Sequence, residues 1–149
     1  MKVVEILKVK GDILYTVSPD ASLADAAATM AELDVGSLIV MEFGTLVGIL
    51  TFREVIKALN GKVASLADTG TVRKHMDDSP ITVTPGTGID EVRRMMLEKH
   101  ARYLPVMNSG TLLGVISFYD VAKGVLEAQC LENRLLKAYI REWPGEPGM

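Results

Sequence analysis

Residues 114–120 read GVISFYD and residues 48–54 read GILTFRE, so the chain contains one short pattern twice. Both stretches begin with glycine and two aliphatic residues, continue with a hydroxyl residue and phenylalanine, and end with a carboxylate, aspartate in one and glutamate in the other. The two stretches lie 66 residues apart, and the correspondence continues without a gap between residues 15–57 and residues 81–123. Glycines, prolines and phenylalanines recur together at this spacing, which predicts an internal structural repeat.

Each copy predicts the same order of secondary structure. A short β-rich piece, YTV or ITV, precedes a proline turn, and residues 22–34 or 88–100 then carry apolar residues at helical spacing. Two apolar strands joined by a short connection with glycine follow, and a second helix begins at Thr51 or Ser117. The predicted unit is therefore β-α-β-β-α, and the predicted fold class is α+β.

The predicted organisation has four parts. A first repeat with the N-terminal segment covers residues 1–60, a linker covers 61–71, a second repeat covers 72–126, and a long helix with its tail covers 127–149. One unit of this size buries little apolar surface, so the two units are expected to pack face to face about a pseudo-twofold axis.

The C-terminal helix carries an apolar stripe beyond the repeat. Leu131, Leu135, Tyr139 and Trp143 follow one another at intervals of three to four residues, which places them on one helical face. An apolar face without a partner in its own chain favours a second chain, so the sequence predicts a homodimer. The alternative is that the helix folds back on its own domain.

Composition narrows the functional class. The chain has 149 residues, 48% of them hydrophobic, and a formal net charge of -3, which indicates a globular protein and argues against a nucleic acid partner. No signal peptide or membrane span is expected, and Cys130 is the single cysteine, so the expected location is cytoplasmic.

The repeated motif has a structural and a functional interpretation. The pairs Ser117 with Asp120 and Thr51 with Glu54 have the spacing of a capping box, in which hydroxyl and carboxylate satisfy free backbone N–H groups at a helix start. A glycine-containing strand that runs into a helix start also favours an anion such as phosphate. An aspartate there is suited to bind both hydroxyls of a ribose. Asp120 is the better ribose candidate, and Glu54 is the better cap.

The 66-residue repeat, the segment HARYLPV before the second hairpin and the Gly-aliphatic-x-Ser-x-x-Asp element after it resemble a tandem pair of cystathionine β-synthase (CBS) domains. The resemblance covers residues 3–125. It implies a non-catalytic sensor that binds an adenosine-containing ligand between the two units and reports it to an unknown downstream protein. AMP, ADP and ATP lead the expected ligands, followed by NAD and S-adenosylmethionine, and no cofactor is obligatory.

The resemblance also implies roles for particular residues. Asp120 would bind the ribose hydroxyls, Ser117 phosphate or ribose, and Arg102 the phosphate, while Tyr119 would line the mouth of the site. The adenine wall and the remaining ligand contacts would come from Ser79, Ile81, Val83, Tyr103 and Pro105.

A weaker second site would lie in the first repeat. It would contain Tyr15, Val17, Thr51, Arg53 and Glu54. Its departures from the family pattern are Glu54 in place of aspartate and Gly36 in the position of Arg102.

Two rival functions use the same fold. One is a dimerising scaffold whose clefts are vestigial. The other is an enzyme such as IMP dehydrogenase, which carries a similar pair inserted in a barrel, but such a barrel alone needs about 250 residues. His75 and His100 are far apart and lack neighbours at ligand spacing, so no metal site is expected.

Overall fold

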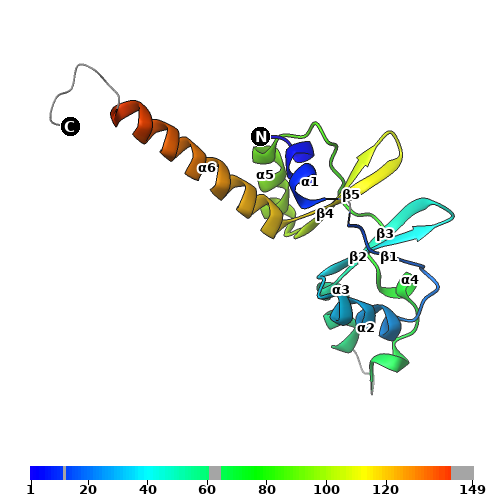
Figure 1. Ribbon diagram of the computed structural model, residues 1–149. Helices are drawn as coiled ribbons and strands as arrows, with labels where there is room; N and C mark the ends of the chain where they lie inside the picture. The colour runs from blue at the N-terminus through cyan, green and yellow to red at the C-terminus, as the bar shows by residue number, and fades with distance from the viewer. Residues whose placement is uncertain (12, 61–64, 142–149) are drawn as a thin grey trace.

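The computed structural model describes residues 1–11, 13–60 and 65–141, and it confirms an α+β fold built from two repeats and a long C-terminal helix (Figure 1). The helices are α1 (Val3–Lys10), α2 (Leu23–Leu33), α3 (Phe52–Leu59), α4 (Val72–His75), α5 (Ile89–Lys99) and α6 (Phe118–Arg141), with a 3-10 turn η1 at Leu66–Asp68. The strands are β1 (Thr16–Val17), β2 (Ser37–Glu42), β3 (Thr45–Thr51), β4 (Tyr103–Asn108) and β5 (Thr111–Ser117). Residues 61–64 of the expected linker and residues 142–149 of the expected tail, including Trp143, lie outside the described residues.

The two repeats end their central helices in the same way. α2 stops at Asp34 and α5 stops at His100, and both residues adopt the left-handed conformation with φ near 54° and 53°. This conformation turns the chain out of the helix and toward the next strand. At the other end of α2, the Ser22 hydroxyl accepts a hydrogen bond of 3.0 Å from the Asp25 backbone N–H.

Each repeat continues into an antiparallel hairpin. The turns Phe43–Gly44 and Ser109–Gly110 each have two residues with positive φ, which matches the twist of the flanking strands. Both hairpins shift register at the same place, after Val40 in β2 and after Val106 in β4. The repeat predicted from the sequence therefore extends to the irregularities of the sheets.

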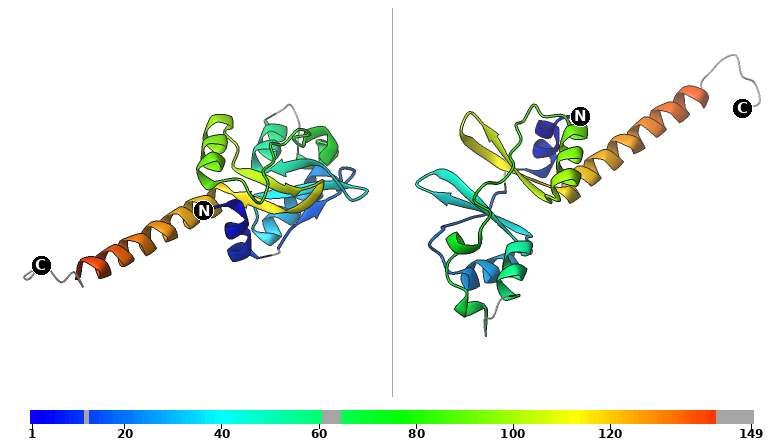
Figure 2. Two further views of the ribbon diagram at one scale, coloured as in Figure 1. Left: turned by 90° about the horizontal axis from the view of Figure 1, so that it is seen from above. Right: turned by 180° about the vertical axis from the view of Figure 1, so that it is seen from behind.

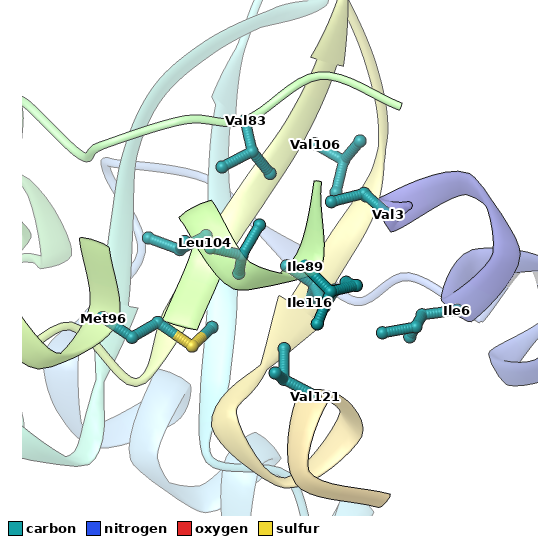
Figure 3. Close-up of a cluster of buried hydrophobic side chains, with 10 residues drawn as sticks. Val3, Ile6, Val83, Ile89, Met96, Leu104, Val106, Ile116 and Val121 are labelled. Carbon is teal, nitrogen blue, oxygen red and sulfur yellow. The ribbon is translucent and has the colours of Figure 1, made fainter. Parts of the chain in front are cut away.

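The two cores are separate clusters, one in each repeat. The first repeat buries Leu23, Ala26, Met30, Leu38, Val40, Leu50, Ala58 and Val72. The second buries Val3, Ile6, Val83, Ile89, Val92, Met96, Leu104, Val106, Ile116 and Val121 (Figure 3).

The helix that precedes each repeat packs on the other repeat. α1 precedes the first repeat, but its Val3 and Ile6 point into the core of the second (Figure 3). α4 precedes the second repeat, but its Val72 lies in the core of the first. The N-terminal segment, which the sequence groups with the first repeat, therefore completes the second core.

Backbone hydrogen bonds hold both exchanged helices in equivalent ways. The N–H of Val3 donates to Thr87 O at 3.0 Å, and the N–H of Val72 donates to Ala21 O, the matching position, at 2.9 Å. The spacing between Val3 and Val72 is 69 residues rather than 66, because α1 continues for longer than α4 before the repeat begins. The additional turn of α1 carries Lys10 at its end.

α6 packs on the second repeat only near its start. A Cβ added at Gly124 would lie 3.2 Å from Ile6 Cδ1, so glycine lets α6 approach α1 closely. Beyond this point the helix projects away from both repeats in all views (Figures 1 and 2). Its exposed apolar residues are Leu126, Leu131, Leu135, Leu136, Tyr139 and Ile140. The alternative in which the helix folds back on its own domain is therefore wrong for the described part of α6 beyond Leu126.

Substitutions at a buried and at an exposed strand position should lower the free energy of unfolding by different amounts. Leu50 is fully buried, whereas Leu113 in β5 is 44% exposed. We expect Leu50→Ala to lower the free energy of unfolding by about 2–5 kcal/mol and Leu113→Ala to lower it by less than about 1 kcal/mol. Urea unfolding followed by circular dichroism measures both, and equal losses would contradict the assigned core.

Candidate functional site

A large open cleft of about 1610 Å³ lies between the two repeats. The starts of α3 and α6, which lie inside the two copies of the repeated motif, both contribute to its lining. Near Gly36 the repeats come close together, because a Cβ added there would lie 1.8 Å from the hydroxyl oxygen of Tyr103. The two candidate sites therefore share one cleft.

Both copies of the motif form capping boxes. In the first, the Glu54 carboxylate accepts hydrogen bonds from the Thr51 N–H at 3.0 Å and from the Thr51 hydroxyl. In the second, Asp120 Oδ2 accepts from the Ser117 N–H at 2.9 Å, and the Asp120 N–H donates to the Ser117 hydroxyl at 3.0 Å. The expected cap at Glu54 is confirmed, and Asp120 caps its helix as well, so capping does not distinguish the two acids.

Asp120 has a second partner that Glu54 does not share among the described residues. Lys10 Nζ donates to Asp120 Oδ2 at 2.7 Å and to the carbonyl oxygen of Val115 at 2.9 Å. Both side chains of the ion pair are largely buried. The end of α1 is thereby tied to the start of α6, which places an ammonium group on the carboxylate that the motif assigns to ribose.

The environment of Asp120 lowers the pKa of its carboxyl group. Burial acts in the opposite direction and would raise the pKa. The hydrogen bonds from Lys10 and from the Ser117 N–H, together with the charge of Lys10, outweigh burial and stabilise the carboxylate. Asp120 is therefore ionised at neutral pH.

The lowered pKa predicts an acid-sensitive contribution to stability. Because the folded-state pKa lies below the unfolded value of about 3.9, the contribution is complete above that pH and is lost as the pH falls through the folded pKa. We expect the stability advantage of the wild type over Asp120→Asn to be constant above about pH 5 and to shrink as the pH falls below it. Urea unfolding at several pH values checks this, and an advantage that grows on acidification would contradict the ion pair.

Most of the predicted site residues line the cleft. Those in the lining are Ile81, Arg102, Tyr103, Ser117 and Tyr119 from the main site and Tyr15, Thr51, Arg53 and Glu54 from the weaker one. Asp120 is not among the lining residues, whereas its partner Lys10 is.

The structure corrects the expected adenine wall at Val83. Val83 is buried in the second core, where its N–H donates to Pro105 O, and Pro105 is also buried. Its counterpart Val17 packs against the first core. The reason is the same in both repeats. Tyr15 and Ile81 line the cleft, and two residues later the chain pairs with the sheet at Val17 and Val83.

Ser79 is exposed, and its side chain is directed to its own loop. Its N–H donates to Asp77 Oδ1 at 3.0 Å, and its hydroxyl donates to Asp78 Oδ1 at 3.3 Å. Ser79 is absent from the cleft lining. These contacts are typical of a local turn.

Sequence reasoning missed several residues of the cleft. Lys10 lies outside the repeat, so the motif gave no signal for it. Phe52 and Phe118, the repeated phenylalanines, both line the cleft, and the duplicated pattern itself was the signal that points to them.

The two histidines, considered in the sequence as possible metal ligands, lie in structural positions. His75 Nε2 lies 2.7 Å from the carbonyl oxygen of Thr69, and His100 ends α5. Within residues 1–11, 13–60 and 65–141, no three His, Cys, Asp or Glu side chains cluster in a way that suits a metal ion. Over the same residues, no helix has both the length and the apolar character needed to cross a membrane.

The fold and the shared cleft define a pair of similar domains packed about one ligand-sized opening. A family model for the CBS domain matches residues 9–61 and 72–127, so the chain belongs to the CBS domain family and carries the domain twice. An uncharacterized 17.7 kDa protein of Acidianus ambivalens is 32% identical over 121 residues, which cover 80% of this chain and 71% of that protein.

Solved structures show the same fold. A CBS-domain containing protein from Agrobacterium tumefaciens superposes with a TM-score of 0.79 at 30% identity, over 83% of this chain and 98% of that one. The protein CBSX2, solved in complex with AMP, superposes with a TM-score of 0.72 at 27% identity, over 86% of this chain and 98% of that one.

Proposed function

We propose that this protein is a non-catalytic regulatory module that senses an adenosine-containing ligand in the cleft between its CBS domains. The observation that carries the proposal is the shared cleft, into which the starts of α3 and α6 both open. Helix N-termini favour phosphate groups, and the exposed aromatic and aliphatic side chains of the lining suit a purine base. The complex of CBSX2 with AMP supports a ligand of this class.

In the proposed complex, the ribose hydroxyls replace Lys10 on the Asp120 carboxylate. One Asp120 oxygen already accepts from Lys10 at 2.7 Å and from the Ser117 N–H at 2.9 Å, so the carboxylate is held in place and ionised. A ribose diol donates two charge-assisted hydrogen bonds to such a group. Ligand binding and the Lys10 contact then compete for the same acceptor, which couples the site to α1.

A second candidate function is a dimerising scaffold with vestigial clefts. The observation that favours it is that the cap and the ion pair already occupy one oxygen of the Asp120 carboxylate. In either case we propose a homodimer, because α6 exposes an apolar face beyond the repeats. A scaffold would show no change in melting temperature with any adenosine ligand.

The two halves of the cleft should bind the ligand with different affinities. The first half has Gly36 where the second has Arg102, and the Tyr103 hydroxyl fills the space in front of Gly36. We expect calorimetry to detect one tight site per chain and a second site at least about tenfold weaker, since a charge-assisted phosphate contact is missing. Two equally tight sites would contradict this asymmetry.

A further inference from the structure

The cleft is basic although the protein is acidic. Among the described residues, five Lys and Arg side chains and His100 line it, against two carboxylates, Glu54 and Asp77. The five are Lys10, Arg53, Lys57, Lys99 and Arg102. The whole chain has a formal net charge of -3, so positive charge is concentrated where the proposed ligand binds.

Four of these five cations keep an uncompensated charge. Lys10 is neutralised by Asp120, but no described carboxylate forms an ion pair with Arg53, Lys57, Lys99 or Arg102. Glu54, the carboxylate next to Arg53, is directed to Thr51 in its capping box. The cleft therefore presents four cations that no described carboxylate pairs, and a bound anion would pair them.

Most of the cleft cations have no basic counterpart at the equivalent position of the other repeat. The counterparts of Arg53, Lys99 and Arg102 in the other repeat are Tyr119, Leu33 and Gly36, which are uncharged. Lys57 does have a basic counterpart, Lys123, but Lys123 is absent from the lining. Each repeat thus contributes two cations to one cleft, and three of these four positions are uncharged in the other repeat.

We infer that the cleft selects adenine nucleotides with two or three phosphates over AMP, adenosine and the cationic S-adenosylmethionine. This inference rests on the proposed function and specifies its ligand. A single exposed ion pair is weak and is screened by salt, so one phosphate gains little from cations spread over both repeats. A polyphosphate chain offers several acceptors in sequence and meets cations from both sides, with guanidinium groups suited to bidentate contacts.

Calorimetry of the full chain with adenosine, AMP, ADP, ATP, GTP, S-adenosylmethionine and inorganic tripolyphosphate tests the inference. We expect affinity to rise at least about tenfold from AMP to ATP, and to fall more steeply for ATP than for AMP between about 50 and 300 mM NaCl. S-adenosylmethionine should bind more weakly than AMP.

Two double variants test whether the cleft cations, rather than the total positive charge of the protein, determine ATP affinity. Arg53→Gln with Lys57→Gln, and Lys99→Gln with Arg102→Gln, should each reduce ATP affinity about tenfold or more and reduce AMP affinity less. The matched control is Lys123→Gln with Arg94→Gln, which removes the same charge outside the cleft and should leave the ratio of ATP to AMP affinity unchanged.

The outcomes distinguish the inference from the proposed function. Equal affinities for AMP and ATP, or an equal effect of the control variant, would overturn the inference and leave an adenosine sensor. Tripolyphosphate or GTP binding as tightly as ATP would overturn adenosine recognition. Absence of binding by every compound would overturn both.

Discussion

Asp120→Ala is expected to abolish the rise in melting temperature that an adenine nucleotide gives to the wild type. A ligand at 100 times its Kd stabilises the folded state by about 2.7 kcal/mol, which corresponds to about 5–10 °C for a chain of this size. Asp120 supplies the carboxylate proposed to bind the ribose, so its loss should remove most of this shift. Differential scanning fluorimetry with and without AMP and ATP measures it.

Asp120→Ala also removes a helix cap and an ion pair, so it needs a control that loses the ion pair and keeps the cap. Lys10→Met is that control, because it breaks the contact of 2.7 Å but keeps the carboxylate and the capping box. We expect Lys10→Met to lower the melting temperature of the free protein and to keep or enlarge the ligand-induced shift, because the contact that competes with the ribose is gone. An Asp120→Ala protein that responds like the wild type would show that the ribose role is wrong.

Truncation after Glu127 is expected to shift the protein from dimer toward monomer. The described residues after Val125 are not part of either core, so the shortened chain keeps both cores and loses the projecting part of α6. Leu131 is 55% exposed and Leu135 is 62% exposed, and burying such side chains in a second chain contributes roughly 1.5–3 kcal/mol each. We expect the dimer to weaken at least about a hundredfold, as measured by light scattering over a dilution series.

Substitutions on α6 test the same face without shortening the chain. Leu131→Ser with Leu135→Ser should weaken the dimer in the same direction as the truncation. Arg134→Gln with Lys137→Gln alters two exposed charged positions on the opposite side of α6 and serves as the control, with little effect expected on the dimer. A dimer of unchanged affinity after truncation would assign the interface to the helices of the two repeats alone.

The local features of the fold could be predicted because each rests on residues close together in the chain. The spacing of 66 residues aligned both hairpins, and the hydroxyl and acid three residues apart indicated both helix caps. The apolar spacing over residues 88–100 predicted a helix in this range, and the left-handed backbone of His100 ends α5. Short-range hydrogen bonds and turns of this kind depend on local residue types alone.

The contacts of α1 could not be predicted, because they join residues that are distant in sequence. Lys10 and Asp120 are 110 positions apart, and neither the motif nor the helical periodicity connects them. Val83 was wrongly expected in the adenine wall for a related reason. Its position in the repeat is clear from the sequence, but the point at which the chain leaves the cleft and joins the sheet depends on pairing with Val106.

The exchange of α1 and α4 has a consequence for how the chain folds. The core of the first domain contains Val72 from α4, and the core of the second contains Val3 and Ile6 from α1, so neither half encloses its core with its own residues in sequence order. The cooperative folding unit is therefore the pair, and contacts between distant parts of the chain must form before either half is complete. A single domain of this kind could reach the same packing only by lending its leading helix to a second copy and receiving one in return, as in a domain-swapped dimer.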